Sequence, residues 1–463
     1  MGMTRWLPLG KAKVSPAALL AGIVVAALAL RLAWIGFVDD GLHNITLPPL
    51  EDRGPAYTEL LTNKLTDDQA FYVRSAQYLA MGEGYREPFT ESVTARWPPG
   101  YPLILSVLFA AVGPSILAAQ VLNAALGALS IVLLYLVGAR LFDRRVGLTA
   151  AALLALFPAQ VFFSGLLMTE VLLTAGLLAL LWLVLVRLPQ KHPLSPRWLV
   201  VAGLALGGLA MVRGEVALMV PVLGVYWAMG GTSWRRAAAQ AALVLGAMAA
   251  VYVPWTIRNV IQLDAPVILT TGTGGALIQG HAEGATGDLN QEIYDSLRAQ
   301  YTDRPEPERQ VAENNAGLRK SLEFMVTHPL DELRLIPVKL YYLYRDDPGG
   351  RTWAQLLRFG VGGESVLRRL GDGYYLLVLW LAILGAVTAG RQLFRGDRLL
   401  LPLVVVMWSF VYGFVYVGDG RYHFPLVPLF CLFAAFFVWW LLTGQPKGER
   451  GQGKQGTRSR PGR

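Results

Sequence analysis

Long apolar runs separated by short polar connections dominate the chain. A helix that crosses the hydrocarbon core of a bilayer needs about 20 predominantly apolar residues. The runs that approach this length are residues 14–38, 115–139, 146–163, 171–187, 198–212, 216–230, 236–255, 373–391, 398–417 and 421–443. They predict an all-α polytopic membrane protein with about ten transmembrane helices. The first run is too long for the core of a signal peptide, so we expect a retained anchor.

The charges between the runs predict which connections face the cytoplasm. Lysine and arginine are concentrated in residues 140–145, 187–197, 233–236 and 391–398 and in the tail 444–463. The positive-inside rule places these segments in the cytoplasm, so the long loops 39–114 and 256–372 lie on the other side. This requires that the apolar segment 98–113 does not cross, and we expect a re-entrant or interfacial helix there. Residues 1–443 then form a transmembrane domain, and residues 444–463 form a basic, disordered cytoplasmic tail.

Composition agrees with a membrane protein. Hydrophobic residues make up 54% of the chain and charged residues 16%, against about a quarter charged in ordinary soluble domains. The net charge is +9, but six of the basic residues lie in the Gly-rich tail, where they suit anionic lipid headgroups better than nucleic acid. The sequence has no zinc-ligand pattern or nucleotide-binding fingerprint, so we expect no cytosolic nucleotide as a substrate.

The stretch TDDQAFYVRSAQYLAMGEGY predicts an ordered helix in the first outer loop. Thr66 and Gln69 have the spacing of a capping box, which starts the helix at the next residue. Asp68 and Tyr72 are four residues apart and therefore lie on one face. The paired acids are explained either as first-turn residues that favour the helix dipole or as functional carboxylates.

Glu170 is the only charge in the apolar stretch FPAQVFFSGLLMTEVLLTAGLL. It falls where the chain re-enters the membrane from the outer side. A carboxylate within a membrane helix costs about 2.5–3.5 kcal/mol on insertion scales, and such residues usually serve a function and have a partner. The alternative is a helix cap formed together with Thr169.

Four arginines lie at the same predicted outer level, outside every cytoplasmic loop. They are Arg96 before WPPGYP, Arg213 in MVRGEV, Arg258 in PWTIRN and Arg421 in GDGRYHFP. Each alone would be explained by snorkelling to lipid headgroups. Together with the two carboxylates they predict a phosphate pocket, because phosphate oxygens suit the bidentate guanidinium. His281, in a Gly-rich stretch, belongs either to the site or to a flexible surface turn.

This set of groups fits sugar transfer from a polyprenyl phosphate. The phosphate is already a competent leaving group, so the protein must supply charge neutralisation there and a base for the acceptor hydroxyl. A single displacement would invert the anomeric centre. A transporter or lipid-linked-sugar flippase is the alternative, although transporters commonly show repeats and charges at the midplane. A non-catalytic scaffold is a third interpretation.

A resemblance rests on stretches that recur in a fixed order. They are TDDQAFYVRSAQYLAMGEGY, RWPPGYPL, LFDRRVGLTAAALLA, FPAQVFFSGLLMTE, PWTIRN, GGALIQGHAEGATGD and GDGRYHFPLVPL. The chain resembles membrane glycosyltransferases of the GT-C superfamily, in particular the bacterial relatives of protein O-mannosyltransferases and of the lipid A aminoarabinose transferase. This implies a hexosyl- or pentosyltransferase in the bacterial plasma membrane, with its active site facing outside the cytoplasm. The donor would be a polyprenyl-phosphate-linked sugar and the acceptor a glycan, lipid or protein.

The resemblance also implies roles for individual residues. Asp68 and Glu170 match the family's two acids and are the predicted catalytic residues. Where the aminoarabinose transferase has a phosphate-binding lysine, this chain has Trp97 with Arg96 beside it. The predicted donor-phosphate ligands are Arg96, Arg258 and Arg421, and the other predicted substrate contacts are Asp67, Tyr72, Trp97, Tyr101, Arg213, His281, Tyr422 and His423. The alternative for the RYHFP set is structural, with Arg421 and His423 bracing the start of the last helix. No obligate metal is expected, and a divalent cation held by the two acids is left open.

Overall fold

The computed structural model describes residues 15–38, 65, 67–88, 90–190, 194–347 and 360–444. Within these residues the regular structure is helical, apart from one isolated bridge between Arg86 and Val93. The predicted basic tail lies outside the described residues, except for Gly444.

Seven described helices are long and apolar enough to cross a membrane, and a bent pair makes an eighth if it is counted as one span. The long spans are α1 (Pro16–Phe37), α5 (Ile116–Leu141), α8 (Thr169–Arg187), α11 (Trp234–Leu263), Ser365–Phe394 within and after α17 (Gly360–Ala389), Gly396–Val415 with α18 (Leu400–Phe410), and Gly420–Thr443 with α19 (Val427–Thr443). The bent pair is α6 (Arg144–Ala155) with Pro158–Gly165, which begins with α7 (Pro158–Phe162), and the shorter apolar helices are α4 (Gly100–Val112), α9 (Pro196–Ala210) and Gly214–Met229, which contains α10 (Met219–Met229). All ten predicted runs are helical, which confirms the predicted fold class. Two of them, α9 and Gly214–Met229, are shorter than a full span.

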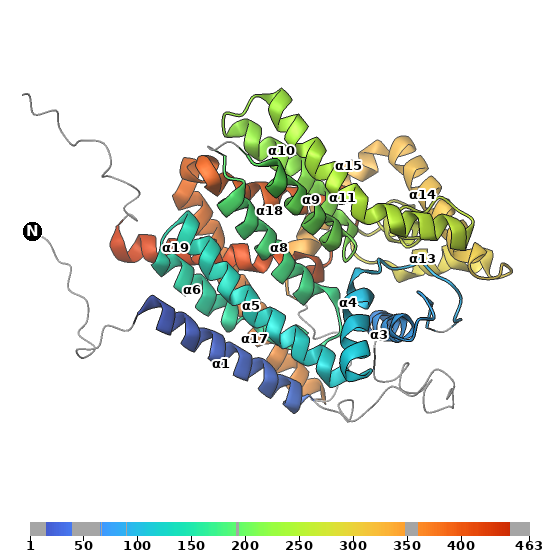
Figure 1. Cartoon of the computed structure of the whole chain (residues 1–463), viewed down its shortest axis with the longest axis horizontal. Helices are drawn as coiled ribbons and strands as arrows, with labels where there is room; N and C mark the ends of the chain where they lie inside the picture. The colour runs from blue at the N-terminus through green and yellow to red at the C-terminus, as the bar shows by residue number, and fades with distance from the viewer. Residues whose placement is uncertain are drawn as a thin grey trace, which may run out of the picture.

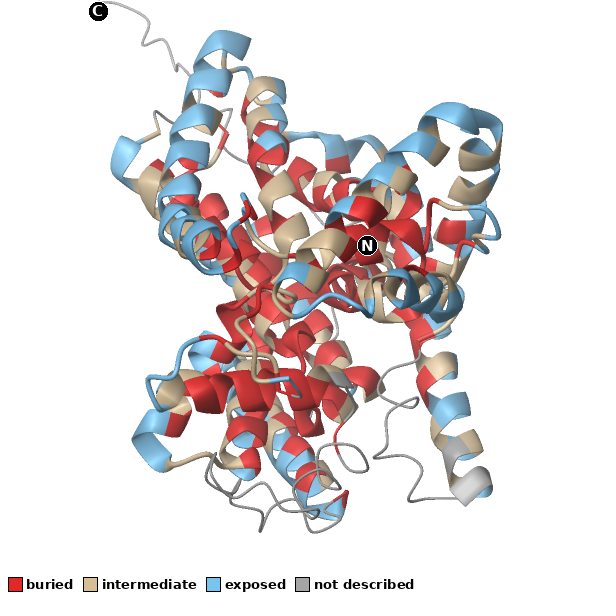
Figure 2. Ribbon diagram, turned by 90° about the vertical axis from the view of Figure 1, so that its right-hand side faces the viewer, coloured by how far each residue is buried: buried red, intermediate tan, exposed pale blue. Residues whose placement is uncertain are grey.

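The outer loops build a second group of helices at one end of the bundle. They are α3 (Asp67–Ala80), α12 (Thr273–Ile278), α13 (Gln291–Arg298), α14 (Glu308–Thr327) and α15 (Pro329–Tyr344). Figure 1 shows α3, α4, α13 and α14 on the right of the view. Figure 2 shows the buried residues gathered in the middle of the molecule and the exposed ones on the outward faces of its helices.

The predicted cytoplasmic connections converge at the opposite end of the bundle. Arg140 lies 3.1 Å from Asp397, whose carboxylate also accepts hydrogen bonds from the backbone of Gln190 and the hydroxyl of Tyr226. The connections after α5, α8 and the span Ser365–Phe394 therefore share one side of the molecule. This agrees with the predicted topology, and which end faces the cytoplasm stays a prediction.

Helix α4 is short for a membrane span, and whether it crosses the membrane stays a prediction. Its 13 residues span only about 20 Å at 1.5 Å per residue, against a hydrocarbon core of about 30 Å. Its first amide, of Gly100, donates to the carbonyl of Met211 directly after α9. Its last turn ends at Gly113, whose φ of +84° turns the chain into the start of α5. The start of α4 therefore lies at the end of α9, and its end leads directly into α5.

The bent pair has a buried arginine at its break. The two helices meet at 61°, where Pro158 has no amide hydrogen to donate. Arg31 on α1 is fully buried and donates to the carbonyls of Ala27 and Ala155, at 3.1 Å and 3.4 Å. The guanidinium therefore supplies a donor to a carbonyl at the end of α6, as non-helical backbone at membrane depth requires.

Gly385 sets the contact between α17 and α19, which gives a first prediction. A Cβ at Gly385 would collide with the backbone carbonyl of Phe433, so Gly385→Ala should destabilise the protein by about 1–3 kcal/mol through overpacking. Gly373→Ala on the same helix is the matched control, because a Cβ there meets nothing within 4 Å. Thermal unfolding in detergent measures both. Equal unfolding midpoints in the two variants would contradict the close packing.

Candidate functional site

Two carboxylates and two arginines from four separate segments meet at the outer-loop end of the bundle. Arg421 Nη1 lies 3.1 Å from Asp68 Oδ2, and its Nε lies 3.4 Å from Glu170 Oε1. Arg213 Nη1 lies 3.7 Å from the same Glu170 oxygen. One guanidinium therefore bridges the two predicted catalytic acids, and a second stands beside Glu170.

The two acids differ in accessibility. The side chain of Asp68 is 23% exposed, whereas that of Glu170 is 2% exposed. Glu170 lies in the first turn of α8, which has no side-chain cap, and its partners are the two arginines and the Thr169 hydroxyl, which donates to it at 3.4 Å. A molecule that approaches from outside can therefore reach Asp68 more readily than Glu170.

Buried amides hold the irregular chain that leads into Glu170. Gln120 and Asn123 on α5 donate to the carbonyls of Gly165 and Leu166, at 2.9 Å and 2.6 Å. Gln69 on α3 accepts from the amide of Leu167 at 2.9 Å. Because Gln69 is next to Asp68, this bond also fixes the start of α3 against the start of α8. Thr66 of the predicted capping box and the side chain of Asp67 lie outside the described residues.

Arg421 and Arg213 are themselves held in place. Arg421 opens the short helix η7 (Gly420–Leu426), where its amide donates to the capping carboxylate of Asp419 at 2.7 Å. Arg213 Nε lies 2.7 Å from Glu215, and its Nη2 donates to the Tyr412 hydroxyl at 2.8 Å. Tyr412 in turn donates to Glu215 at 2.6 Å.

Aromatic rings complete the site. Tyr412, on the π-helix η6 (Val411–Val415), stacks on Tyr422 with 4.5 Å between ring centroids. Both arginines lie over the Tyr422 ring, at 5.2 Å and 5.3 Å, which is the cation–π range. Tyr72 lies edge-on to Tyr101 at 5.3 Å, and burial together with the charges of Asp68 and Glu170 raises the pKa of Tyr72. Of these rings, Tyr72, Tyr101 and Tyr422 were predicted and Tyr412 was missed.

Arg96 and Arg258 take other positions. Arg96 contacts the Tyr294 hydroxyl and the carboxylates of Glu313 and Glu306, at 2.8–3.3 Å. Arg258 donates to the backbone carbonyls of Thr94 and Tyr85, at 2.6 Å and 2.9 Å. Both tie the first outer loop to neighbouring segments, and no described contact joins either one to Asp68 or Glu170. Their binding of phosphate stays a prediction.

Trp97, His281 and His423 are in packed surroundings. Trp97 lies edge-on to Phe71 of α3. His281 is fully buried, so the alternative of a flexible surface turn is wrong. His423 is also buried and stacks on Tyr375 at 4.4 Å, which agrees with bracing of the final helix. Contact of the two histidines with substrate stays a prediction.

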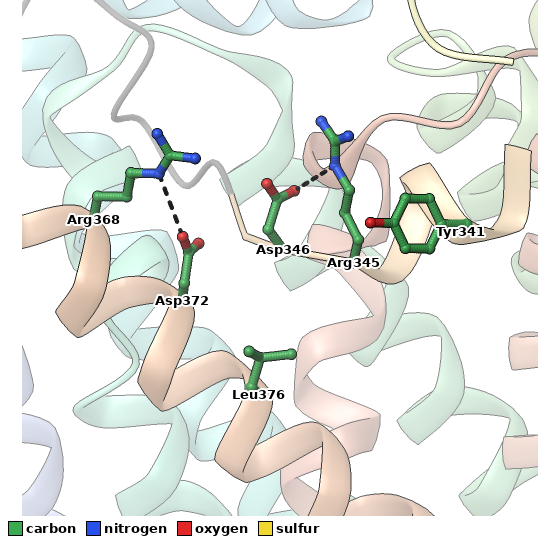
Figure 3. A pocket seen from close by; sticks show the side chains of 6 residues that line it. All are labelled: Tyr341, Arg345, Asp346, Arg368, Asp372 and Leu376. Carbon is green, nitrogen blue, oxygen red and sulfur yellow. Dashed lines mark ion pairs between the residues drawn. The ribbon is translucent and has the colours of Figure 1, made fainter. Parts of the chain in front are cut away.

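An open cavity of about 430 Å³ lies between α15 and α17. Figure 3 shows Arg345 paired with Asp346 and Arg368 paired with Asp372 around it. Tyr341 also lines this cavity and is 62% exposed. The lining combines two ion pairs with one aromatic ring, and it shares no residue with the Asp68–Arg421 group.

The described residues do not assemble a divalent-cation site. Divalent cations such as calcium take six or more oxygen ligands, and no group of three or more His, Cys, Asp or Glu side chains is close enough together in the described part of the chain. The two candidate carboxylates instead share the guanidinium of Arg421. Metal dependence of the protein stays a prediction.

These features define a polytopic helical membrane protein whose ionisable groups gather where ordered outer loops meet one end of the bundle. This is the fold of the GT-C glycosyltransferases, which the chain was predicted to resemble. The family model for dolichyl-phosphate-mannose-protein mannosyltransferase matches residues 96–257, a segment that includes Glu170 and Arg213.

Two solved structures share this fold at TM-scores of 0.50 or more. The apo oligosaccharyltransferase of Archaeoglobus fulgidus superposes with a TM-score of 0.53 at 13% identity, over 93% of this chain and 51% of that chain. The archaeal oligosaccharyltransferase AglB from Archaeoglobus fulgidus, in complex with an inhibitory peptide and a dolichol-phosphate, gives 0.50 at 12% identity, over 94% and 52%. ArnT from Cupriavidus metallidurans bound to undecaprenyl phosphate gives 0.41 at 16% identity, over 90% and 78%. The chain thus spans about half the length of the archaeal enzymes, and no curated protein sequence matches it.

Proposed function

We propose that the protein transfers a sugar from a polyprenyl-phosphate donor to an acceptor hydroxyl, with inversion at the anomeric carbon. The reaction would take place at the extracytoplasmic face of a bacterial plasma membrane. The acceptor class is a cell-envelope glycan, a lipid or a protein. The matching family model names a dolichyl-phosphate-mannose donor, and one structural neighbour binds dolichol-phosphate, which supports a lipid phosphate as the donor class.

One observation carries the proposal, namely the bridging of Asp68 and Glu170 by Arg421 at 3.1 Å and 3.4 Å, with Arg213 at 3.7 Å. A donor phosphate would compete with the carboxylates for these guanidinium groups, because charge-assisted bidentate contacts to phosphate are strong. Its arrival would free the exposed carboxylate of Asp68 while Glu170 keeps the arginines aligned.

The transfer step moves one proton and leaves one additional negative charge on the departing phosphate. Asp68 accepts the proton of the acceptor hydroxyl as the acceptor oxygen bonds to the anomeric carbon. The bond between that carbon and the phosphate oxygen breaks, and the electron pair leaves with the polyprenyl phosphate. Arg421 and Arg213 stabilise the negative charge that develops on the leaving phosphate.

Turnover of a donor panel tests the proposal. Purified protein in detergent is given radiolabelled polyprenyl-phosphate sugars, each with a mixture of envelope glycans, lipids and unfolded peptides as acceptors. We expect one donor to lose its sugar to an acceptor. The same protein is also reconstituted into proteoliposomes, where donor that crosses the membrane without cleavage would indicate the flippase instead. Folded protein that neither binds nor cleaves any donor would overturn the proposal.

A further inference from the structure

A second group of ionisable side chains is buried beside the site. His281 follows α12, and Glu332 and Lys339 lie on α15; the side chains of His281 and Lys339 are fully buried. His281 Nδ1 lies 2.9 Å from both carboxylate oxygens of Glu332, and its Nε2 lies 2.9 Å from the carbonyl of Val415. Lys339 Nζ lies 3.4 Å from the same Nε2. We call these three residues the buried cluster.

The hydrogen bonds of the cluster constrain its charge. A neutral imidazole has a single N–H, yet both ring nitrogens of His281 face acceptors. A neutral ring therefore donates either to Glu332 or to Val415, depending on which nitrogen carries the proton, and the ammonium of Lys339 is a further donor that faces Nε2. Burial lowers the pKa of Lys339 to about 8, and burial together with Lys339 lowers the pKa of His281. One positive charge held by the His281–Lys339 pair is therefore balanced by one carboxylate.

The cluster joins three stretches of chain at close range. Val415 is the last residue of η6, the helix that carries Tyr412. Two residues after Tyr416, the amide of Gly418 donates to the carbonyl of Gly287 at 2.9 Å. A Cβ at Gly418 would collide with the carbonyl of Lys339, and one at Gly280 would lie 2.8 Å from the carbonyl of Tyr416. The second outer loop, α15 and the chain from η6 to η7 are thus packed backbone against backbone.

We propose that the buried cluster is a positioning element for the site. It fastens the second outer loop to residues 411–421. This holds two side chains in place at the site: Tyr412, which bonds to Arg213, and Arg421, which bridges the two candidate carboxylates. The expected effect on the donor KM rests on the proposed function, because Arg421 binds the donor phosphate only under that function. The expected effect on the rigidity of residues 411–421 does not. His281 is a positioning residue in this proposal and does not touch substrate.

Donor kinetics test the consequence for the site. His281→Gln and Glu332→Gln should raise the donor KM about 10-fold and leave the acceptor KM within about 2-fold, because only the phosphate-binding side is displaced. Gln310→Leu is the matched control. Gln310 is equally buried and bonds the first outer loop to α14 through Thr94 and Ala95, so its loss should lower the unfolding temperature without changing the donor KM. A donor KM unchanged in the cluster variants overturns the link to Arg421.

Hydrogen exchange tests the mechanical part without any turnover. In His281→Gln, amides of residues 411–421 should exchange about 10-fold faster than in wild type, whereas in Gln310→Leu they should not. Exchange as slow as in wild type would overturn the proposal, whatever the kinetics show. If wild type turns over no donor, the proposed function fails while the exchange measurement still decides this inference.

Discussion

Asp68→Asn should reduce sugar transfer by about 10²–10⁴-fold, the usual contribution of a general base, while donor binding is retained. Asparagine has nearly the same shape as aspartate but cannot accept the proton of the acceptor hydroxyl. It also withdraws one negative charge from Arg421, 3.1 Å away, so donor affinity should stay the same or increase. Single-turnover transfer and equilibrium binding of the same labelled donor separate the two effects.

The control for Asp68→Asn is Glu83→Gln, which neutralises an exposed acid of the same outer loop. It should transfer sugar at the wild-type rate. If Asp68→Asn keeps more than about a tenth of the rate, a hundredfold role in proton transfer is excluded. Glu170 would then be the next candidate, although its 2% exposure makes direct contact with an acceptor harder.

Arg421→Ala should weaken donor binding by about 100-fold, since truncating one partner of a buried, hydrogen-bonded charge pair commonly costs 2–5 kcal/mol and each 1.4 kcal/mol is tenfold. Arg421→Lys should recover only part of this affinity, because an ammonium group cannot reproduce the planar, bidentate contacts of a guanidinium. Equilibrium binding of labelled donor to detergent-purified variants measures both. Wild-type affinity in Arg421→Ala would show that the phosphate lies elsewhere.

Arg334→Gln controls for loss of a positive charge at the outer face. Its side chain is 78% exposed and pairs with Asp331 on the same helix, so the donor affinity should not change. The same measurement on Arg96→Gln and Arg258→Gln decides whether these two predicted phosphate ligands act on the donor. Unchanged donor affinity with a lower unfolding temperature would assign them to loop packing.

Hydropathy and charge predicted the level of each residue in the membrane, and this explains which parts of the site were found. Asp68, Glu170, Arg213 and Arg421 were expected at the outer mouths of different helices, and the structure brings all four together. The same reasoning gives no lateral position, because two residues at one depth can lie on opposite sides of a bundle. Arg96 and Arg258 were therefore grouped with Arg421, although their contacts are with the outer loops.

Residues whose role depends on distant partners were missed. Tyr412 lies in a continuous apolar run, where nothing marks it as the partner of Arg213 and Glu215. Gln120 and Asn123 gave a usable signal, because two amides in an apolar helix need buried partners. The sequence allowed the Gly-rich stretch around His281 to be interpreted as a flexible surface turn. In the structure its glycines instead allow the backbone to pack closely against α14, because a Cβ at Gly274 would collide with the carbonyl of Asn314.

The bridge that Arg421 forms between Asp68 and Glu170 also bears on side reactions with water. While the guanidinium holds Asp68, that carboxylate is a poor base for water as well as for an acceptor. Under the proposed function, Asp68 is released only when the donor phosphate takes its place at Arg421, so an acceptor can be deprotonated only after the donor has bound. Without donor, the carboxylate of Asp68 and the guanidinium of Arg421 neutralise each other, and hydrolysis by water should be slow.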